Sequence, residues 1–236
     1  MGSGPDAAHA VSITFLLDVD NTLLDNDGLK DHIAREIVRL AGTASAARFW
    51  QMYEAVRSEE DYVDYPTTVR RWAEEVGNPI LGRQVNDMLE QLPFTEYLYP
   101  HALETIAHLR TLGTVAILSD GDQEFQPLKI RRSGLAAAVE GRVMIFVHKE
   151  NELPAVFARY PAGHYVAVDD KPRIVSALER LCPVTFTTVL VLQGRYAEAG
   201  PSNPPPDLIV SHIGDLRHFG REQFFAGTRV RGPVGD

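Results

Sequence analysis

The sequence contains a single cysteine, Cys182, so it can form neither an internal disulfide nor a zinc site built on several cysteines. It also lacks a basic excess, because 23 lysines and arginines face 32 acidic residues and the formal net charge is −9. A negative field repels phosphate backbones, which argues against nucleic acid as a partner. These absences predict a cytoplasmic protein that does not bind nucleic acid.

Long hydrophobic runs are absent as well. The longest apolar stretches, 13–17 and 189–192, fall far short of the ~20 residues that span a bilayer. The first five residues, Met1–Pro5, lack the basic and apolar regions of a secretion signal. We therefore expect no membrane partner and no secretion.

The apolar residues that are present, 44% of 236, are sufficient for a sizeable core. Short runs rich in β-branched residues indicate buried strands at 13–17, 115–118, 143–147, 165–168, 189–192 and 208–210. Helical patterns separate several of these runs, including one that begins near Pro100 and one near Pro172. Strands that alternate with helices predict an α/β fold with a doubly wound, mostly parallel sheet.

The stretch between the first two predicted strands has no strand pattern and is much longer than a crossover needs. Its apolar residues recur at helical spacing in four groups: Leu29, Ile33, Ile37 and Leu40; Phe49, Tyr53 and Val56; Val69, Trp72 and Val76; and Leu81, Val85, Met88 and Leu92. We predict a helical module inserted at 25–95. The α/β core would then comprise 13–24 and 96–220, with tails at 1–12 and 221–236.

Two acid pairs follow predicted strands. Asp18 and Asp20 end the first strand, and Asp169 and Asp170 end the fourth. Parallel sheets bind ligands at the carboxyl edge, although an isolated pair of this kind more often caps a turn. A carboxylate is already ionised at neutral pH, so Asp18 can attack phosphorus without a base, while Asp20 can act as an acid and then as a base.

A hydroxyl and an ammonium group follow the two other strands. Ser119 ends the second strand and Lys149 follows the third, where each could hold a phosphoryl oxygen. Alone, each is more typical of a turn or a solvated surface. Four carboxylates at one edge repel one another unless a cation lies among them, and oxygen ligands without histidine or cysteine suit Mg²⁺. The combination predicts a magnesium site that handles a phosphoryl group.

With these motifs, the sequence from about 13 to 219 resembles the haloacid dehalogenase-like (HAD) hydrolase superfamily. Asp18-Val19-Asp20-Asn21-Thr22 is similar to its first motif, Ser119 to the second, Lys149 to the third and Asp169-Asp170 to the fourth. The insertion lies where members with a helical cap after the first motif carry it. The segment 206–216 resembles the closing segment of the phosphoglycolate phosphatase-like branch.

The resemblance implies an α/β core with an α-helical cap and a phosphatase mechanism. Asp18 would attack phosphorus to form an aspartyl-phosphate, and Asp20 would protonate the leaving alcohol and then activate water. Ser119 and Lys149 would hold the transferring oxygens, Asp18, the backbone carbonyl of Asp20 and Asp169 would ligate Mg²⁺, and Asp170 would orient Lys149 or a metal-bound water. The substrate would be a small phosphorylated metabolite.

Asp20 favours a phosphatase over a true dehalogenase, which does not use an aspartate at that position. Three alternatives stay open: a phosphomutase of the same superfamily, a receiver-like phosphorylated domain, and a non-catalytic binding protein. The receiver fits poorly, because its acid pair and its phosphorylated aspartate lie on different strands.

Two further assignments depend on the cap and on the third motif. Lys149 lacks the proline that often follows the third-motif lysine, so Lys129 is the second candidate, although its pattern is typical of a helix surface. The segment 59–65 is the predicted part of the cap that faces the site. Its acids would disfavour a second anionic group on the substrate unless Arg57, Arg70 or Arg71 offsets them; solvated surface positions are an equally good interpretation.

Overall fold

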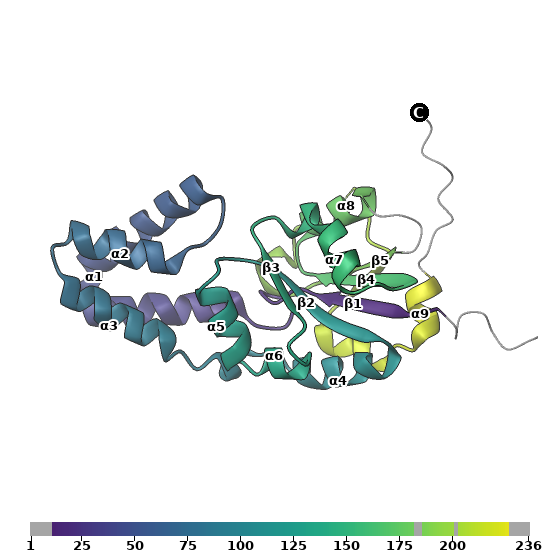
Figure 1. Ribbon diagram of the computed structural model, residues 1–236. Helices are drawn as coiled ribbons and strands as arrows, with labels where there is room; N and C mark the ends of the chain where they lie inside the picture. Colours follow the sequence, from purple (N-terminus) through teal and green to yellow (C-terminus); the bar gives the residue numbers. More distant parts are fainter. Residues whose placement is uncertain (1–10, 182–185, 201–202, 227–236) are drawn as a thin grey trace, which may run out of the picture.

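The computed structural model describes residues 11–181, 186–200 and 203–226, so Cys182 lies outside the described residues. Six parallel strands form one sheet in the order β3-β2-β1-β4-β5-β6 (Figure 1). The strands are β1 (Ile13–Leu17), β2 (Thr114–Asp120), β3 (Val143–Phe146), β4 (His164–Asp169), β5 (Phe186–Val191) and β6 (Leu208–Val210). The predicted doubly wound α/β fold is confirmed, and every predicted strand is present.

Alternation along β1 divides the core between the two faces of the sheet. Phe15 and Leu17 belong to the larger apolar cluster, whereas Leu16 belongs to the other. The larger cluster includes residues of α4 (Ala102–Leu112), α5 (Phe125–Arg132) and α6 (Leu135–Ala138), and the smaller includes α7 (Leu153–Arg159) and α8 (Pro172–Leu181). Both faces are therefore covered, which is why the central strands are continuously apolar.

The sequence predicts a tail from residue 221, and this boundary is wrong for residues 221–226. They form a helix, α9 (Arg221–Ala226), whose Phe224 is fully buried. The Phe224 ring lies 5.0 Å from the ring of Phe15 in an edge-on arrangement. The two rings bury apolar area at the centre of one sheet face, so the core extends through this helix.

The helical module is formed by α1 (Asn26–Glu60), α2 (Tyr65–Glu75) and α3 (Pro79–Glu90), which lie together on one side of the sheet (Figure 1). Helix α1 is a hairpin of two helices, because Gly42 has φ 75° and ψ 162° and interrupts the helical backbone. Lys30 contacts the ring of Trp50, 20 residues later, which would be about 30 Å away in a straight helix. The structure thus contains the four predicted helices.

The two ends of this module are joined to each other where they meet the core. The backbone N–H of Asp25 donates to the carbonyl of Tyr97 at 2.7 Å, and Tyr99 N–H donates to the Leu23 carbonyl at 3.0 Å. Tyr97 ends a short 3₁₀ helix, η2 (Phe94–Tyr97). The chain therefore enters and leaves the module through two hydrogen-bonded segments, close to the predicted limits of 25 and 95. Among the described helices, none is both long and apolar enough to cross a membrane.

Candidate active site

The loop after β1 presents two carboxylates at the carboxyl edge of the sheet. Asp18 continues from β1, and its N–H donates to the carbonyl of Val168 in β4 at 2.9 Å. The chain then turns at Asn21, whose φ of 59° is left-handed, a conformation that asparagine tolerates better than most residues. The Asn21 side-chain oxygen accepts from the N–H groups of Asn26 and Asp27, the first residues of α1. Hydrogen bonds therefore join the loop after β1 to the first turn of α1.

Lys149 lies between two of the predicted carboxylates. Its Nζ is 2.5 Å from Asp18 Oδ1 and 2.6 Å from Asp169 Oδ2, and its side chain is buried. Burial alone would lower the pKa of Lys149, but Asp169 and Asp18 outweigh it and raise that pKa. Conversely, burial would raise the pKa of Asp18, but Lys149 holds it below its ordinary value. The pair is therefore charged, and Asp18 carries the ionised carboxylate that a nucleophile needs.

Of the two partners expected for Asp170, Lys149 is not in contact with it. Asp170 makes no hydrogen bond to Lys149, and neither of its carboxylate oxygens has a partner although both are buried. Carboxylate oxygens of Asp18, Asp169 and Asp170 lie within 4.8 Å of one another. Burial, followed by repulsion from Asp169 and Asp18, raises the pKa of Asp170 to about 9. The structure therefore places Asp170 within the carboxylate cluster itself.

The cluster has the properties of a divalent cation site. Asp18 Oδ2 and both oxygens of Asp170 are buried without a hydrogen-bond donor, which is unfavourable for a carboxylate. A cation among them would satisfy these oxygens and cancel the mutual repulsion. The oxygen-only donor set fits Mg²⁺ better than a softer metal.

Ser119 lies near the end of β2, the neighbour of β1, and is 1% exposed. Its Oγ accepts a hydrogen bond from Gln126 Nε2 at 2.9 Å. Among the described residues, the hydroxyl proton has only the carbonyl of Asp120 as an acceptor, at 3.3 Å, which is long for an O–H···O bond. Gln126 therefore leaves Ser119 able to donate to a ligand at the sheet edge.

Two site residues were missed by the sequence reasoning. The carboxylate of Asp120 accepts from the backbone N–H of Lys149 at 2.9 Å and so fixes the start of the 3₁₀ turn η3 (Lys149–Asn151). Lys171 Nζ lies 3.9 Å from the same carboxylate. Burial lowers the pKa of Lys171, but Asp18 and other acids outweigh it and raise that pKa. Asp120 directly follows Ser119, and Lys171 directly follows Asp170. This adjacency in the sequence is the signal that could have identified them.

The haloacid dehalogenase-like hydrolase family model matches residues 14–182, which include all of the carboxylates and lysines described so far. The chain belongs to this family. A member of the family from Burkholderia xenovorans is 42% identical, with a TM-score of 0.83 over 90% of this chain and 98% of its own.

Two more distant structures with the fold of this HAD protein are each 18% identical to it in sequence. The HAD hydrolase YfnB of Bacillus subtilis, in a magnesium-bound form, has a TM-score of 0.59 over 88% of this chain and 97% of its own. An L-2-haloacid dehalogenase of Xanthobacter autotrophicus, with covalently bound chloropropionic acid, has a TM-score of 0.56 over 86% and 96%. No curated protein matches the chain. At this identity the two distant structures show a common fold alone.

Lys129 is buried in this HAD hydrolase, so the expectation of a helix-surface position is wrong. Its Nζ donates to Asp20 Oδ1 at 2.5 Å and to Asn26 Oδ1 at 3.1 Å. Helix α5 therefore supplies a second lysine to the site, and each lysine holds one carboxylate of the first motif. Lys149 instead lies between Asp18 and Asp169.

The predicted cap segment 59–65 reaches the core. Asp61 Oδ2 lies 3.1 Å from Nε2 of His148, the residue before Lys149. Tyr65 is buried, and its ring lies 4.8 Å from the ring of Phe125 in α5. The three cap arginines named above pair with acids of the cap itself: Arg57 with Glu54, Arg70 with Glu74 and Arg71 with Glu59. Their solvated interpretation is therefore favoured.

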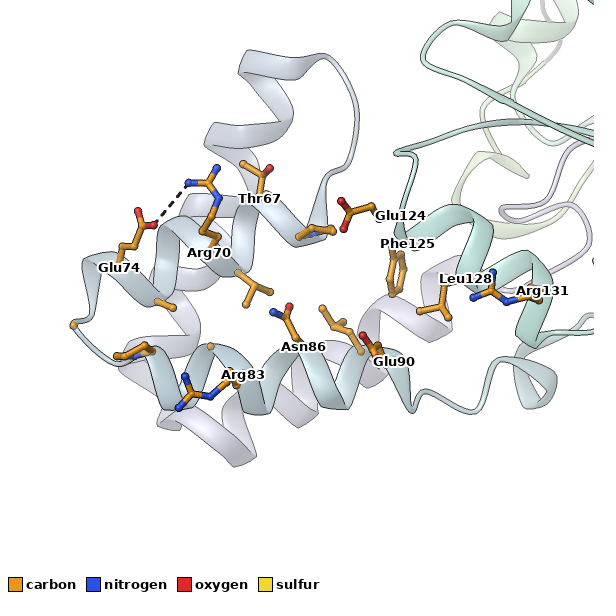
Figure 2. A pocket seen from close by; sticks show the side chains of 17 residues that line it. Thr67, Arg70, Glu74, Arg83, Asn86, Glu90, Glu124, Phe125, Leu128 and Arg131 are labelled. Carbon is orange, nitrogen blue, oxygen red and sulfur yellow. Dashed lines mark ion pairs between the residues drawn. The ribbon is translucent and has the colours of Figure 1, made fainter.

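A groove of about 1040 Å³ lies elsewhere, between α2 and α3 of the cap and α5 of the core (Figure 2). Phe125 and Leu128 face it from α5, and Arg70, Arg83 and Asn86 face it from the cap. None of the carboxylates and lysines of the site lines this groove. It is a gap at the junction of cap and core, separate from the carboxylate cluster.

Proposed function

We propose that this HAD hydrolase is a magnesium-dependent phosphatase that hydrolyses small phosphomonoesters through an aspartyl-phosphate. The observation that carries the proposal is the second carboxylate of the first motif, Asp20, fixed by Lys129 two residues from Asp18. A phosphate ester releases an alkoxide that needs a proton, whereas halide release from carbon needs none. An acid at this position therefore favours a phosphatase over a dehalogenase, whose leaving group needs no proton.

In the proposed reaction, an Asp18 oxygen forms a bond to phosphorus while the bond from phosphorus to the ester oxygen breaks. Asp20 enters this step in its protonated form and gives its proton to the departing oxygen, which leaves as an alcohol. The ionised Asp20 then takes a proton from a water molecule that attacks the same phosphorus. The acyl phosphate bond breaks, inorganic phosphate departs, and both carboxyl groups return to their starting states.

Lys149 and Ser119 would hold the transferring phosphoryl oxygens. Lys149 is already in contact with Asp18 at 2.5 Å, so an oxygen bound to it lies close to the nucleophile. Ser119 can donate its proton because Gln126 occupies its acceptor side. Such fixed donors stabilise the charge that accumulates on the phosphoryl oxygens in the transition state.

Asp18, Asp169 and Asp170 would hold Mg²⁺, together with the Asp20 backbone carbonyl that the family resemblance implies. When bound, the ion would offset repulsion between the anionic substrate and the carboxylates. Asp170 differs here from the sequence prediction, which placed it behind the ligands. Its unpartnered buried oxygens support a direct role.

The proposed partner is a small phosphorylated metabolite in the cytoplasm, without nucleic acid or membrane. The cap supports this choice, because a module that contacts the core at His148 restricts access to the sheet edge. The net charge of −9 also disfavours polyanions.

Three products measured with the same enzyme distinguish the possible functions. Phosphate release from 4-nitrophenyl phosphate and a panel of phosphorylated metabolites is expected with Mg²⁺. Halide release from 2-chloropropionate would support a dehalogenase instead, and an isomerised sugar phosphate without free phosphate would support a phosphomutase.

Asp18→Asn and Asp20→Asn separate the two carboxylates. Asp18→Asn is expected to give no phosphoprotein after acid quenching and mass spectrometry, because an amide oxygen is a poor nucleophile. Asp20→Asn is expected to slow alkyl phosphates more than aryl phosphates, whose leaving groups need little protonation. Normal phosphoprotein yield in Asp18→Asn would show that the nucleophile is assigned to the wrong residue.

A further inference from the structure

The side chains around Asp20 determine which leaving groups fit the proposed reaction. Because Asp20 protonates the departing oxygen, the leaving group must extend from the phosphoryl position past this carboxylate. Asp20 is joined through Lys129 to Asn26, the first residue of α1. The start of α1 therefore lies beside this carboxylate.

Lys30 lies four residues after Asn26, so the two side chains share one face of the helix, about 6 Å apart along its axis. The hairpin at Gly42 brings the second half of α1 back beside it. Lys30 Nζ lies 4.5 Å from the ring centre of Tyr53 and 5.2 Å from that of Trp50. The two rings therefore hold this ammonium group on the face of α1 that also carries Asn26.

Among the described residues, no carboxylate lies within ion-pair distance of Lys30 Nζ. Glu54, the nearest acid on the returning helix, pairs with Arg57 at 3.2 Å. Burial lowers the pKa of Lys30; the charge of Glu54 opposes this effect, and the charges of Arg195 and Arg57 add to it. A half-buried cation without a carboxylate partner favours an anion that arrives from outside.

We propose that Lys30 binds a second acidic group on the substrate, so that the preferred substrates are small phosphomonoesters whose leaving group carries a carboxylate or another phosphate. This inference rests on the proposed phosphatase function, because it takes the leaving group to lie beside Asp20. The acids of the cap segment do not oppose it. Asp61 lies beside His148, and the Asp64 side chain accepts from the N–H of Thr67 at the start of α2.

Lys30 suits this role better than the arginines that the sequence suggested. Arg57, Arg70 and Arg71 are each paired with a glutamate of the cap. An ammonium held between aromatic rings keeps its charge while the rings exclude water, which strengthens its attraction for an anion. Tyr53 and Tyr65, whose rings are 5.4 Å apart, continue this row of rings toward α5.

The test compares three substrates: glycerol 3-phosphate, 3-phosphoglycerate, which adds a carboxylate, and glycerol 1,3-bisphosphate, which adds a phosphate. The wild type is expected to prefer one of the two acidic substrates at least tenfold in kcat/KM, and the preferred one identifies the group bound. Lys30→Met is expected to remove this preference, mainly through KM, and to leave 4-nitrophenyl phosphate within twofold. Lys30→Arg should restore part of it.

Arg39→Met is the matched control, because it removes one positive charge from an exposed position of the same helix, where Arg39 pairs only with Glu36. Arg39→Met should leave kcat/KM unchanged for all three substrates. If Lys30→Met lowers the melting temperature markedly, the substrate preference is measured in Lys30→Gln and Lys30→Arg instead. Loss of a purely structural lysine would lower the rates on acidic and neutral substrates equally.

Two failures can be told apart. Hydrolysis of 4-nitrophenyl phosphate without any preference for acidic substrates, or an equal loss on all substrates in Lys30→Met, would overturn the Lys30 site and leave the phosphatase intact. No hydrolysis of any phosphate ester would overturn the proposed function, and the Lys30 site with it.

Discussion

Two buried lysines, on different elements, each hold one carboxylate of the Asp18–Asp20 pair. Lys149 contacts Asp18 from the loop after β3, and Lys129 contacts Asp20 from α5. A carboxylate held by a fixed donor has fewer accessible orientations, so less entropy is lost when it adopts the reactive geometry. At the scale of single residues, the site is therefore built from two oriented carboxylates.

We predict that Lys129→Met slows hydrolysis of alkyl phosphates by at least tenfold and that of aryl phosphates much less. The reason is that Lys129 positions Asp20, whose proton matters only for a poor leaving group. Initial rates with glycerol 3-phosphate and 4-nitrophenyl phosphate measure the difference. Lys129→Arg should recover part of the alkyl rate. An equal loss on both substrates would show a merely structural lysine.

At the scale of elements, the carboxyl ends of β1 and β4 bring three carboxylates together without hydrogen-bond donors for several of their oxygens. This arrangement followed from the sequence, because strand ends in a parallel sheet meet at one edge. The sequence did not predict which face of α5 points into the core. Its last turn carries three cations, Lys129, Arg131 and Arg132, and no pattern indicates which of them is buried. Helix α9 was missed because six residues with two adjacent phenylalanines are too few to show a helical periodicity.

We predict that Mg²⁺ raises the melting temperature by about 5–10 °C at a concentration near a hundred times its Kd, because it binds the folded state and adds about 2.7 kcal/mol there. Asp170→Asn should reduce this shift. Excess chelator should abolish phosphate release, and Ca²⁺ should restore it poorly because its larger coordination shell alters the site. Full activity in chelator would contradict the metal assignment.

The Gly42 turn determines the shape of the cap. Its φ of 75° and ψ of 162° lie in a region that only glycine occupies readily, although a Cβ there would meet no atom within 4 Å. We predict that Gly42→Ala destabilises the protein by about 1–3 kcal/mol through backbone strain alone. Ala44→Ser, also exposed on the same hairpin, should change stability by less than about 0.5 kcal/mol. Denaturant unfolding of both variants tests this, and an unchanged midpoint for Gly42→Ala would contradict it.

At the scale of the whole molecule, the cap is an insertion whose ends are tied together and whose 59–65 segment touches the core. The sequence predicted that such a module exists and roughly where it lies, because strand and helix periodicities differ. It did not predict the contact of Lys30 with Trp50 and Tyr53, since this requires knowing that α1 folds back on itself. Contacts between distant segments are the part that periodicity does not contain.

We predict that the intact enzyme releases phosphate from small metabolites at least a hundredfold faster than from phosphopeptides, because in the proposed function the cap restricts access to the sheet edge. Malachite green detection of phosphate with matched substrate concentrations measures this ratio. A variant with 26–96 replaced by a short Gly/Ser loop, if it folds, should lose metabolite selectivity. A preference of the intact enzyme for phosphopeptides would contradict the covering role of the cap.

The paired ends of the cap also bear on how the chain reaches its native state. Strands β1 and β2 pair with Thr14 opposite Thr114, so this central contact closes a loop of 100 residues. Once the cap helices have joined Asp25 to Tyr97, the same contact closes a far shorter path. The path shrinks from 100 residues to about 30, and these nearly two halvings lower the closure entropy cost by about 1 kcal/mol. Early formation of the cap would therefore accelerate folding of the sheet beneath it.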